Sequence, residues 1–219
     1  FIILDEMNLS RPEQFFASFL SALEQPPADR LLNLMSKSVM NGPRLISNGR
    51  DLPIPPNVWF IGTANHDEST MEFADKTYDR AHVMEMPRNT EAARFNVNPS
   101  RERAPIRYSS LNKQFDQFAK LHIDQVKASV KWLNKAKFTK TLQEQFRVGW
   151  GNRLEKQMAS YIPTVIASGG TIGEAVDHII ATKLLRKLRD RHDVHVRGLE
   201  EISTQLENEW FNLDDQTLP

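Results

Sequence analysis

The sequence predicts an α/β fold in its first part and an all-helical arrangement in the rest. Two short apolar runs, residues 1–4 and 58–62, lack polar alternation and have the pattern of strands covered on both faces of a parallel sheet. A helical stretch lies between them, and strands that alternate with helices indicate a parallel sheet. After residue 110, apolar side chains recur at steps of three and four residues, which indicates amphipathic helices.

The composition limits the class of protein. A chain of 219 residues is long enough for one large or two small domains, and 40% apolar with 26% charged residues is typical of a globular protein. The 28 basic and 28 acidic side chains cancel, so any nucleic-acid contact has to come from a local patch. The absence of cysteine excludes disulfides and a cysteine nucleophile, and suits a reducing cytoplasm. No apolar run reaches 18 residues, so no membrane contact is expected.

A predicted helix follows the first strand at once. The chain begins inside that strand, and we therefore expect it to be a fragment cut upstream of it. Ser10 and Glu13 have the spacing of a capping box, with Pro12 in the first turn, where its missing N–H costs nothing. The apolar face of this helix comprises Phe15, Phe16, Phe19, Leu20 and Leu23. Prolines at positions 26 and 27 end it.

Residues 42–56 are predicted to form a β-hairpin. Asn48 and Gly49 favour a type I′ turn between strands at 44–46 and 52–54. The prolines of this segment mark it as an edge or protruding ribbon, because proline cannot donate to a ladder. A short helix over 71–79 and a third short strand over 82–86 complete the predicted α/β part.

The predicted elements divide the chain into three parts. Residues 1–87 form the α/β core, residues 88–110 form a linker rich in Arg, Asn, Pro and Ser, and residues 111–219 form a helical domain. Thr171 and Glu174 have capping-box spacing and open a helix that continues to Leu188. The apolar stripes of the other helices are Leu111, Phe115, Phe118, Val126, Val130 and Leu133; Leu154, Met158, Tyr161, Ile162 and Val165; and Leu199, Ile202, Leu206 and Trp210.

An acidic pair, Asp5 and Glu6, ends the first strand. In open α/β sheets, ligands bind beyond the carboxyl ends of the strands. One carboxylate can hold a hydrated Mg²⁺ that bridges nucleotide phosphates, while the next polarises the attacking water. The ordinary alternative is that the two acids only end the strand and cap the following helix.

Two further polar residues lie at corresponding places. Asn65 follows the second apolar run, where an amide can hydrogen-bond both water and a phosphate oxygen; a turn asparagine is the alternative. Arg80 precedes the third predicted strand, where a guanidinium can neutralise phosphoryl charge in its own or a neighbouring subunit. A surface ion pair with Asp79 or Asp75 is the alternative for Arg80.

Taken together, these segments carry a family resemblance. Residues 1–8, Phe-Ile-Ile-Leu-Asp-Glu-Met-Asn, resemble a Walker B strand, and residues 57–65, Asn-Val-Trp-Phe-Ile-Gly-Thr-Ala-Asn, resemble the sensor 1 strand of AAA+ ATPases. The hairpin before the second strand and the run Asp-Arg-Ala-His at 79–82 narrow the resemblance to the McrB/MoxR-like, dynein-related branch. The resemblance covers residues 1–87 and extends more weakly over about 145–190.

The resemblance implies a fold and a set of roles in the first part of the chain. The fold would be the C-terminal part of a P-loop AAA+ core, with an incomplete parallel sheet, followed by an all-α lid. Asp5 would be the Mg²⁺ carboxylate and Glu6 the catalytic base. Asn65 would be the sensor 1 residue, and Arg80 an arginine finger that acts on a neighbouring subunit.

The lid would supply one further cation, called sensor 2. It falls among Arg186, Lys187 and Arg189, and we favour Arg186. The helix dipole offers another reason for a basic helix end. Residues 66–70 depart from the McrB run, so ATP is expected rather than GTP, together with Mg²⁺.

The resemblance also implies an activity and partners. The activity would be NTP hydrolysis coupled to remodelling or translocation in a cytoplasmic homo-oligomeric ring, expected to be hexameric, with a McrB-like DNA restriction system as one setting. A nuclease or other effector subunit and DNA would be its partners. In such a ring the 42–56 ribbon would face the pore, which makes Arg44 and Arg50 candidates for DNA contact.

One required motif is missing from the chain. Hydrolysis in this family needs a Gly-x-x-x-x-Gly-Lys-Ser/Thr loop, and none of the nine glycines precedes a lysine. We expect this loop upstream of Phe1, and the isolated chain to be inactive as an ATPase. The alternatives are a non-catalytic AAA+-like scaffold subunit and a nucleic-acid-binding module that uses the lid helices.

Three other groups have weaker signals. His192, Asp193 and His195 are metal-ligand types without a third partner, and a solvated turn is the more ordinary interpretation. His122 falls on an apolar helical stripe, which favours a core histidine. A basic group, with Trp132 and Phe138 interleaved, suggests either a nucleic-acid patch or a solvated face. Its lysines are Lys127, Lys131, Lys135, Lys137 and Lys140.

Overall fold

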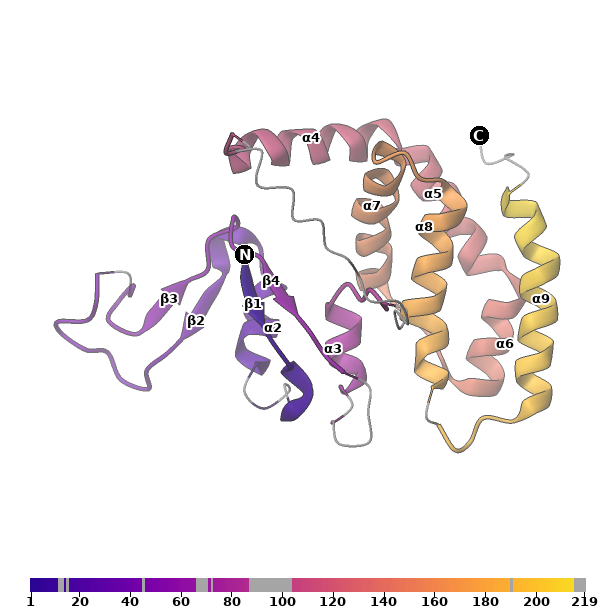
Figure 1. The fold of residues 1–219 in the computed structure, drawn as a ribbon, viewed down its shortest axis with the longest axis horizontal. Helices are drawn as coiled ribbons and strands as arrows, with labels where there is room; N and C mark the ends of the chain where they lie inside the picture. The colour runs from indigo at the N-terminus through magenta and orange to yellow at the C-terminus, as the bar shows by residue number, and fades with distance from the viewer. Residues whose placement is uncertain are drawn as a thin grey trace, which may run out of the picture. The chain divides into compact units, whose positions relative to one another are not determined.

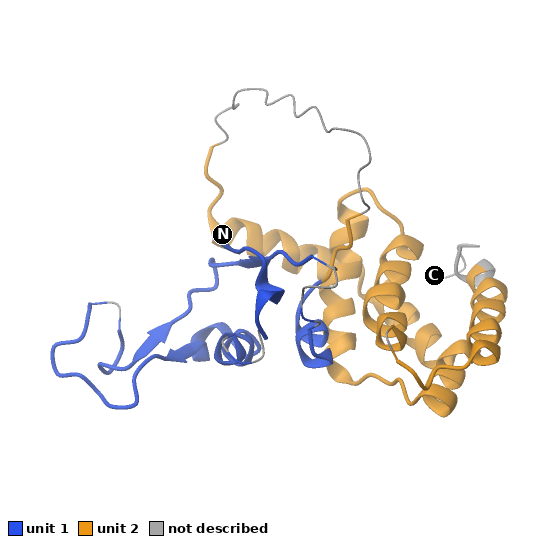
Figure 2. Cartoon of the chain, turned by 60° about the horizontal axis from the view of Figure 1, so that its bottom comes forward, with its two compact units in different colours: residues 1–82 blue, residues 83–219 orange. Residues whose placement is uncertain are grey.

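The computed structural model describes residues 1–11, 14, 16–44, 46–65, 71, 73–86, 104–189 and 191–214, with side chains up to Trp210. The chain divides into two compact units, residues 1–82 and 83–219, coloured separately in Figure 2. Most of the expected linker, residues 88–103, lies outside the described residues. Each unit is described by itself below.

The first unit contains short strands and short helices, labelled in Figure 1. Its elements are β1 (Ile2–Leu4), α2 (Ala17–Leu23), β2 (Leu31–Asn33), β3 (Asp51–Pro53), β4 (Phe60–Gly62) and α3 (Asp75–Arg80), with 3₁₀ turns at Met7–Leu9 and Pro27–Asp29. The helix predicted over 71–79 is confirmed in its second half, as α3 begins at Asp75. In the first predicted helix, Gln14 is helical, Phe16 interrupts the helix and α2 begins at Ala17; Pro12 and Glu13 of the expected first turn lie outside the described residues.

Strands β1 and β4 form a two-stranded parallel sheet, which confirms that the two apolar runs lie side by side and in the same direction. Ile2 pairs with Phe60, Ile3 with Ile61 and Leu4 with Gly62. The ladder continues past both ends of β4, because the backbone N–H of Ile2 donates to Trp59 O and that of Thr63 donates to Leu4 O. The two strands therefore end at the same edge of the sheet.

The expectation that both faces of these strands are covered is wrong within the described residues. Ile2, Ile3 and Ile61 are 44%, 66% and 46% exposed. Phe60, which shares a face of the sheet with its partner Ile2, meets the rings of Phe16 and Phe19, with ring centroids 5.9 and 5.6 Å away. Local packing of α2 therefore covers part of one face, whereas the apolar pattern of the strands is suited to two.

The predicted ribbon is correct in its turn and wrong in its partner strand. Asn48 and Gly49 both have positive φ, 53° and 67°, as a type I′ turn requires. Strand β3, however, pairs antiparallel with β2 and not with residues 44–46; an isolated bridge joins Ser47 to Asp51. A Cβ at position 49 would lie 2.4 Å from the Val39 carbonyl oxygen, so this glycine allows residues 34–50 to fold back closely.

The third predicted strand, residues 82–86, is also wrong. These residues have no regular secondary structure. A strand needs a neighbour to satisfy its N–H and C=O groups, and no described strand is paired with this segment.

The second unit is helical and contains the larger core. Its helices are α4 (Tyr108–Leu121), α5 (Ile123–Lys135), α6 (Lys137–Phe146), α7 (Asn152–Ala167), α8 (Ile172–Ile179) and α9 (Val196–Asp214). Helix α8 continues as a π-helical turn, Ile180–Leu184, and a 3₁₀ turn, Leu185–Leu188. The predicted capping box is confirmed, because the Thr171 hydroxyl accepts from Glu174 N and the Glu174 carboxylate accepts from Thr171 N.

The core of the second unit comes only in part from the predicted apolar stripes. Met158, Ile162 and Leu184 belong to those stripes and are fully buried. Phe138, Leu142 and Val176 are equally buried but were not in any predicted stripe, and α4 has no buried residue although a stripe was predicted for it. Helix α9 packs along α6, while α7 contacts α4, α5 and α8. Within the described part of the chain, no helix is both long enough and apolar enough to cross a membrane.

Candidate site at the strand ends

The parallel register brings the residues that follow β1 close to those that follow β4. Asp5 comes directly after β1, and Thr63 directly after β4. The Thr63 hydroxyl donates a hydrogen bond to Asp5 Oδ1 at 2.5 Å and accepts one from Glu6 N at 2.9 Å. A hydroxyl can donate and accept at once, so this one threonine joins the acidic pair to the neighbouring strand end.

Glu6 has an unusual backbone conformation. Its φ and ψ are 50° and 46°, which is the left-handed region that non-glycine residues seldom adopt. Such a conformation costs about 1 kcal/mol or more and persists where surrounding contacts fix it. Here the contacts are the Glu6 N–H bond to Thr63 and the Met7 N–H bond to Thr63 O at 2.8 Å. Glu6 and Asp5 are both exposed to solvent.

A buried amide, Asn8, fixes the position of Asn65. Asn8 is 2% exposed, its Nδ2 donates to Asn65 O at 2.5 Å, and its Oδ1 accepts from Asn65 N at 3.3 Å. Both polar groups of the side chain are therefore used on one backbone residue 57 positions away. Asn65 itself is exposed. Sequence reasoning gave Asn8 no role; its only signal was its place at the end of the apolar–acidic motif.

Gly62 permits a close approach at the same place. A Cβ on this residue would lie 2.1 Å from Met7 Sδ and 3.2 Å from Met7 Cγ. The Met7 side chain therefore covers the end of β4 only because position 62 has no side chain. Residues 5–8 are held against 62–65 by this packing together with the hydrogen bonds of Thr63 and Asn8.

The structure thus brings three of the predicted site residues together, namely Asp5, Glu6 and Asn65. The Asp5 carboxylate and the Thr63 hydroxyl, which are in contact here, supply oxygen ligands of the kind that Mg²⁺ prefers, and Mg²⁺ bound with phosphates commonly uses only one or two carboxylates. The donor set therefore fits a magnesium ion. Within the described residues there is no cluster of three or more His, Asp or Glu side chains that could hold a metal ion by itself.

Arg80 belongs to the same unit but lies in an ion pair. Its Nε is 3.0 Å from Glu24 Oε2, and its Nη1 donates to the Lys76 carbonyl at 3.3 Å. The carboxylate that meets it is therefore not Asp75 or Asp79, which we considered as alternatives, but one at the C-terminal end of α2. In this conformation the guanidinium links α3 to α2.

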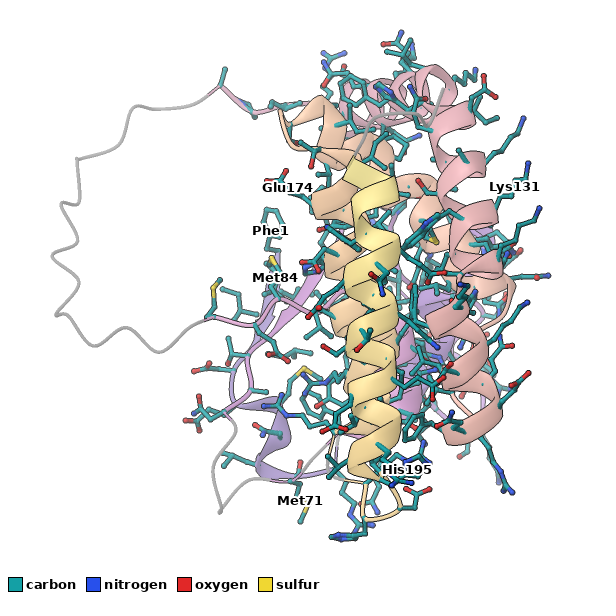
Figure 3. The ribbon with its side chains drawn as sticks, turned by 90° about the vertical axis from the view of Figure 1, so that its right-hand side faces the viewer. Phe1, Met71, Met84, Lys131, Glu174 and His195 are labelled. Atoms are coloured by element: carbon teal, nitrogen blue, oxygen red, sulfur yellow. The ribbon has the colours of Figure 1, made fainter. Side chains whose placement is uncertain are left out.

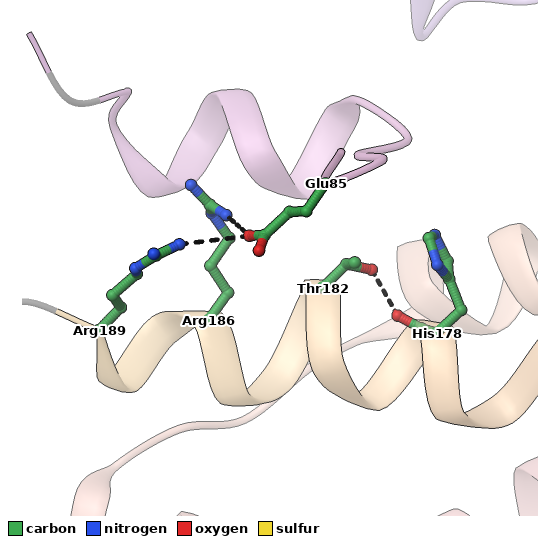
Figure 4. A network of polar contacts seen from close by, with 5 residues as sticks. All are labelled: Glu85, His178, Thr182, Arg186 and Arg189. Carbon is green, nitrogen blue, oxygen red and sulfur yellow. Dashed lines mark hydrogen bonds and ion pairs between the residues drawn. The ribbon is translucent and has the colours of Figure 1, made fainter. Parts of the chain in front are cut away.

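The candidate lid cations lie in the second unit, and two of them, Arg186 and Arg189, meet Glu85 (Figure 4). Arg186 forms an ion pair with Glu85 Oε1, and Arg189 Nη1 lies 3.3 Å from the same oxygen. The Arg186 side chain is 7% exposed, whereas that of Arg189 is 49% exposed. Lys187 instead donates to the Gly149 carbonyl at 3.4 Å. Burial and hydrogen-bond partners thus distinguish the three cations, which their spacing in the sequence could not do.

The His192–His195 segment forms a turn that local side-chain hydrogen bonds stabilise. Arg191 donates to both carboxylate oxygens of Asp193, at 2.9 and 2.5 Å, and these hydrogen bonds hold the pKa of Asp193 below its usual range. His195 Nδ1 accepts from Gly198 N at 3.0 Å. His122, expected in the core, is half-buried at the junction of α4 and α5.

Comparison of the chain with known protein families, curated proteins and solved structures finds no match in any of the three.

Proposed function

We propose that this chain is part of an AAA+ nucleoside triphosphatase, in which the ends of β1 and β4 form one wall of the nucleotide site. The supporting observation is the parallel register of the two strands, which places Asp5 and Glu6 beside Thr63 and Asn65. The carboxyl ends of parallel strands are where α/β sheets bind ligands. A carboxylate pair beside an amide is a suitable set for positioning a phosphate-bound metal and a water.

Each residue has a distinct task in this proposal. Asp5, oriented by the Thr63 hydroxyl, would hold Mg²⁺, which supplies charge neutralisation at the phosphates. Glu6 would accept a proton from the attacking water, and its fixed left-handed backbone would aim the carboxylate away from the strand axis. Asn65, held by Asn8 through its backbone, would orient the water or a phosphate oxygen.

The remaining parts of the site would come from elsewhere. Since the chain has no Gly-Lys dipeptide, a phosphate-binding loop would have to be supplied from outside residues 1–219. Arg80 would act on the site of a neighbouring subunit, which requires it to leave Glu24. Arg186 would serve as the lid cation, and ATP is the expected nucleotide.

The test is hydrolysis by the full encoded polypeptide that contains residues 1–219. We expect Mg²⁺-dependent ATP hydrolysis that Glu6→Gln reduces by about 10²-fold or more while nucleotide binding is kept, because only the proton acceptor is lost. Asp5→Asn should instead weaken the response to Mg²⁺. Glu207→Gln, an exposed change on α9, is the control and should leave hydrolysis unchanged. Unimpaired turnover by Glu6→Gln would remove Glu6 from this role.

A non-catalytic scaffold is distinguished by mixing subunits. Subunits that carry Arg80→Ala are mixed in varied ratios with subunits that carry Glu6→Gln. A site shared between subunits predicts that activity varies non-additively with the ratio, because some interfaces recover an intact pair. A scaffold would hydrolyse nothing before or after mixing.

A further inference from the structure

The lysines of the second unit form a strongly basic region in a chain without net charge. Residues 111–140 contain seven lysines, two aspartates, and neither arginine nor glutamate, which is a net charge of +5. The rest of the chain therefore carries a net charge of −5, so positive and negative charge are unevenly distributed along a chain that is neutral overall. These residues belong to α4, α5 and the first turn of α6.

Five of the lysines are exposed on α5 and at the start of α6, and we call this group the α5–α6 basic face. Its members are Lys127, Lys131, Lys135, Lys137 and Lys140, all exposed. The three on α5 are spaced four residues apart, so they lie on one side of the helix at intervals of about 6 Å. Figure 3 shows Lys131 pointing away from the helices behind it. The opposite side of α5 carries Val126, Ser129 and Leu133, which are buried.

Among the residues that the structure describes, acidic side chains form few contacts with this face. Asp124 lies 3.8 Å from Lys127, but both side chains are more than two-thirds exposed, so the pair is weak. The carboxylate of Glu209 is taken up by the backbone N–H groups of Lys137 and Phe138 at the start of α6. Glu155 of α7 accepts from Asn134.

The aromatic residues near these lysines are not available for stacking on bases. Phe138 is fully buried, and Trp132 is half-buried against the rings of Phe138 and Trp210, with centroids 5.8 and 6.2 Å away. Recognition of unstacked bases needs exposed aromatic faces. The lysine ammonium is a point charge that pairs with phosphate without reading base edges in the bidentate way of arginine.

We propose that the α5–α6 basic face binds the phosphate backbone of a nucleic-acid duplex without sequence preference. A regular row of exposed ammonium groups is complementary to the closely spaced phosphates of a duplex. A lipid surface fits less well, because membrane-bound helices need apolar side chains beside the cations, and no large apolar side chain is exposed between residues 127 and 140. The inference goes beyond the proposed hydrolysis and does not depend on it, since binding needs no nucleotide.

The test is fluorescence anisotropy of random-sequence duplexes titrated with the 219-residue chain, without nucleotide, at several salt concentrations. We expect dissociation constants of about 10⁻⁶ to 10⁻⁴ M, similar for duplex DNA and duplex RNA, that rise steeply with salt. Affinity that differs strongly between unrelated sequences of the same length would contradict binding through the phosphate backbone alone.

A charge-matched pair of variants assigns the binding to this face. Lys127→Gln/Lys131→Gln/Lys135→Gln should weaken binding about tenfold or more and reduce the salt slope by about 2 to 3, because each lost phosphate contact contributes about 0.9. The control Lys37→Gln/Lys76→Gln/Arg197→Gln removes the same charge at other exposed positions and should retain most of the affinity. Glutamine keeps helix propensity close to that of lysine, so folding is preserved.

Three results would overturn the proposal. The first is absence of duplex binding at low salt. The second is an equal loss of affinity in both triple variants, which would indicate net charge alone. The third is tighter binding to vesicles that contain anionic lipid than to either duplex, which would assign the face to a membrane surface.

Discussion

The two units differ in how they bury their apolar side chains. In the second unit, Phe138, Leu142, Met158 and Ile162 belong to one continuous core and are almost fully inaccessible. In the first unit, the clustered core comprises Ala22, Leu32 and Ile54, with half-buried neighbours. The apolar residues of β1 are largely exposed. We therefore expect the second unit to carry most of the stability, and the strand-end site to lie on the part that opens more readily.

This difference shows that local order and stability are separate properties here. The strand ends are joined by specific hydrogen bonds from Thr63 and Asn8, although little apolar surface is buried behind them. Parallel sheets in α/β proteins are normally covered on both faces. A partner that covers β1 and β4 would therefore stabilise the site without changing its local geometry.

The largest expected effect comes from truncating the core of each unit in turn. Phe138→Ala should destabilise the second unit by about 3 to 5 kcal/mol, because it leaves a large cavity in a fully packed region. Ile54→Ala should cost about 2 kcal/mol in the first unit, where half-buried neighbours can move inward. Hydrogen exchange measured by mass spectrometry during denaturant titration reports the two units separately. Equal loss of protection in both units from either change would contradict their independence.

An intermediate effect is expected at the buried amide of the first unit. Asn8→Ala removes both hydrogen bonds to Asn65 and should cost about 1 to 3 kcal/mol, since each hydrogen bond contributes about 0.5 to 1.5 kcal/mol. Exchange of the amides of residues 63–65 should accelerate, while the second unit stays protected. Asn57→Ala, an exposed amide in the same unit, is the control and should change neither. Unchanged exchange in Asn8→Ala would mean that Asn65 is held by other contacts.

The smallest effect is expected from the charge cluster of the second unit. Glu85→Gln should lower stability by no more than about 1 kcal/mol, because the carboxylate is mostly exposed, although it meets both Arg186 and Arg189. A double-mutant cycle should give a larger coupling with Arg186→Gln than with Arg189→Gln, because Arg186 is the more buried cation. The coupling should shrink in high salt. Equal couplings would show that burial does not distinguish the two arginines.

Sequence reasoning succeeded where the determining interactions are local or repeated. The capping box of α8 depends on residues three positions apart, Thr171 and Glu174, and the type I′ turn depends on the dipeptide at 48–49. The stripes of α7 and α8 are repeated over several turns, so buried residues such as Met158, Ile162 and Ile179 could be assigned from spacing, whereas the stripe predicted for α4 has no buried residue. The parallel pairing of β1 and β4 followed from two apolar runs that end in polar residues.

It failed where distant segments compete for the same partner. Strand β3 pairs with Leu31–Asn33 and not with the segment directly before its turn, and nothing within residues 42–56 reveals this choice. Residues 82–86 have strand-like composition, but pairing requires a neighbour that the pattern does not show. The task of Asn8 depends on the β1–β4 register, which becomes visible only after folding.

The β1–β4 register also has a consequence for how the molecule forms. The paired strands are separated by 58 positions along the chain, so a long loop has to close before their first contact can form. Helices α4 to α9, in contrast, arise mainly from interactions between near neighbours in sequence, which favours rapid formation. Chains emerging from denaturant should therefore acquire the helical half early and join Asp5 to Thr63 late, so the strand ends are assembled last.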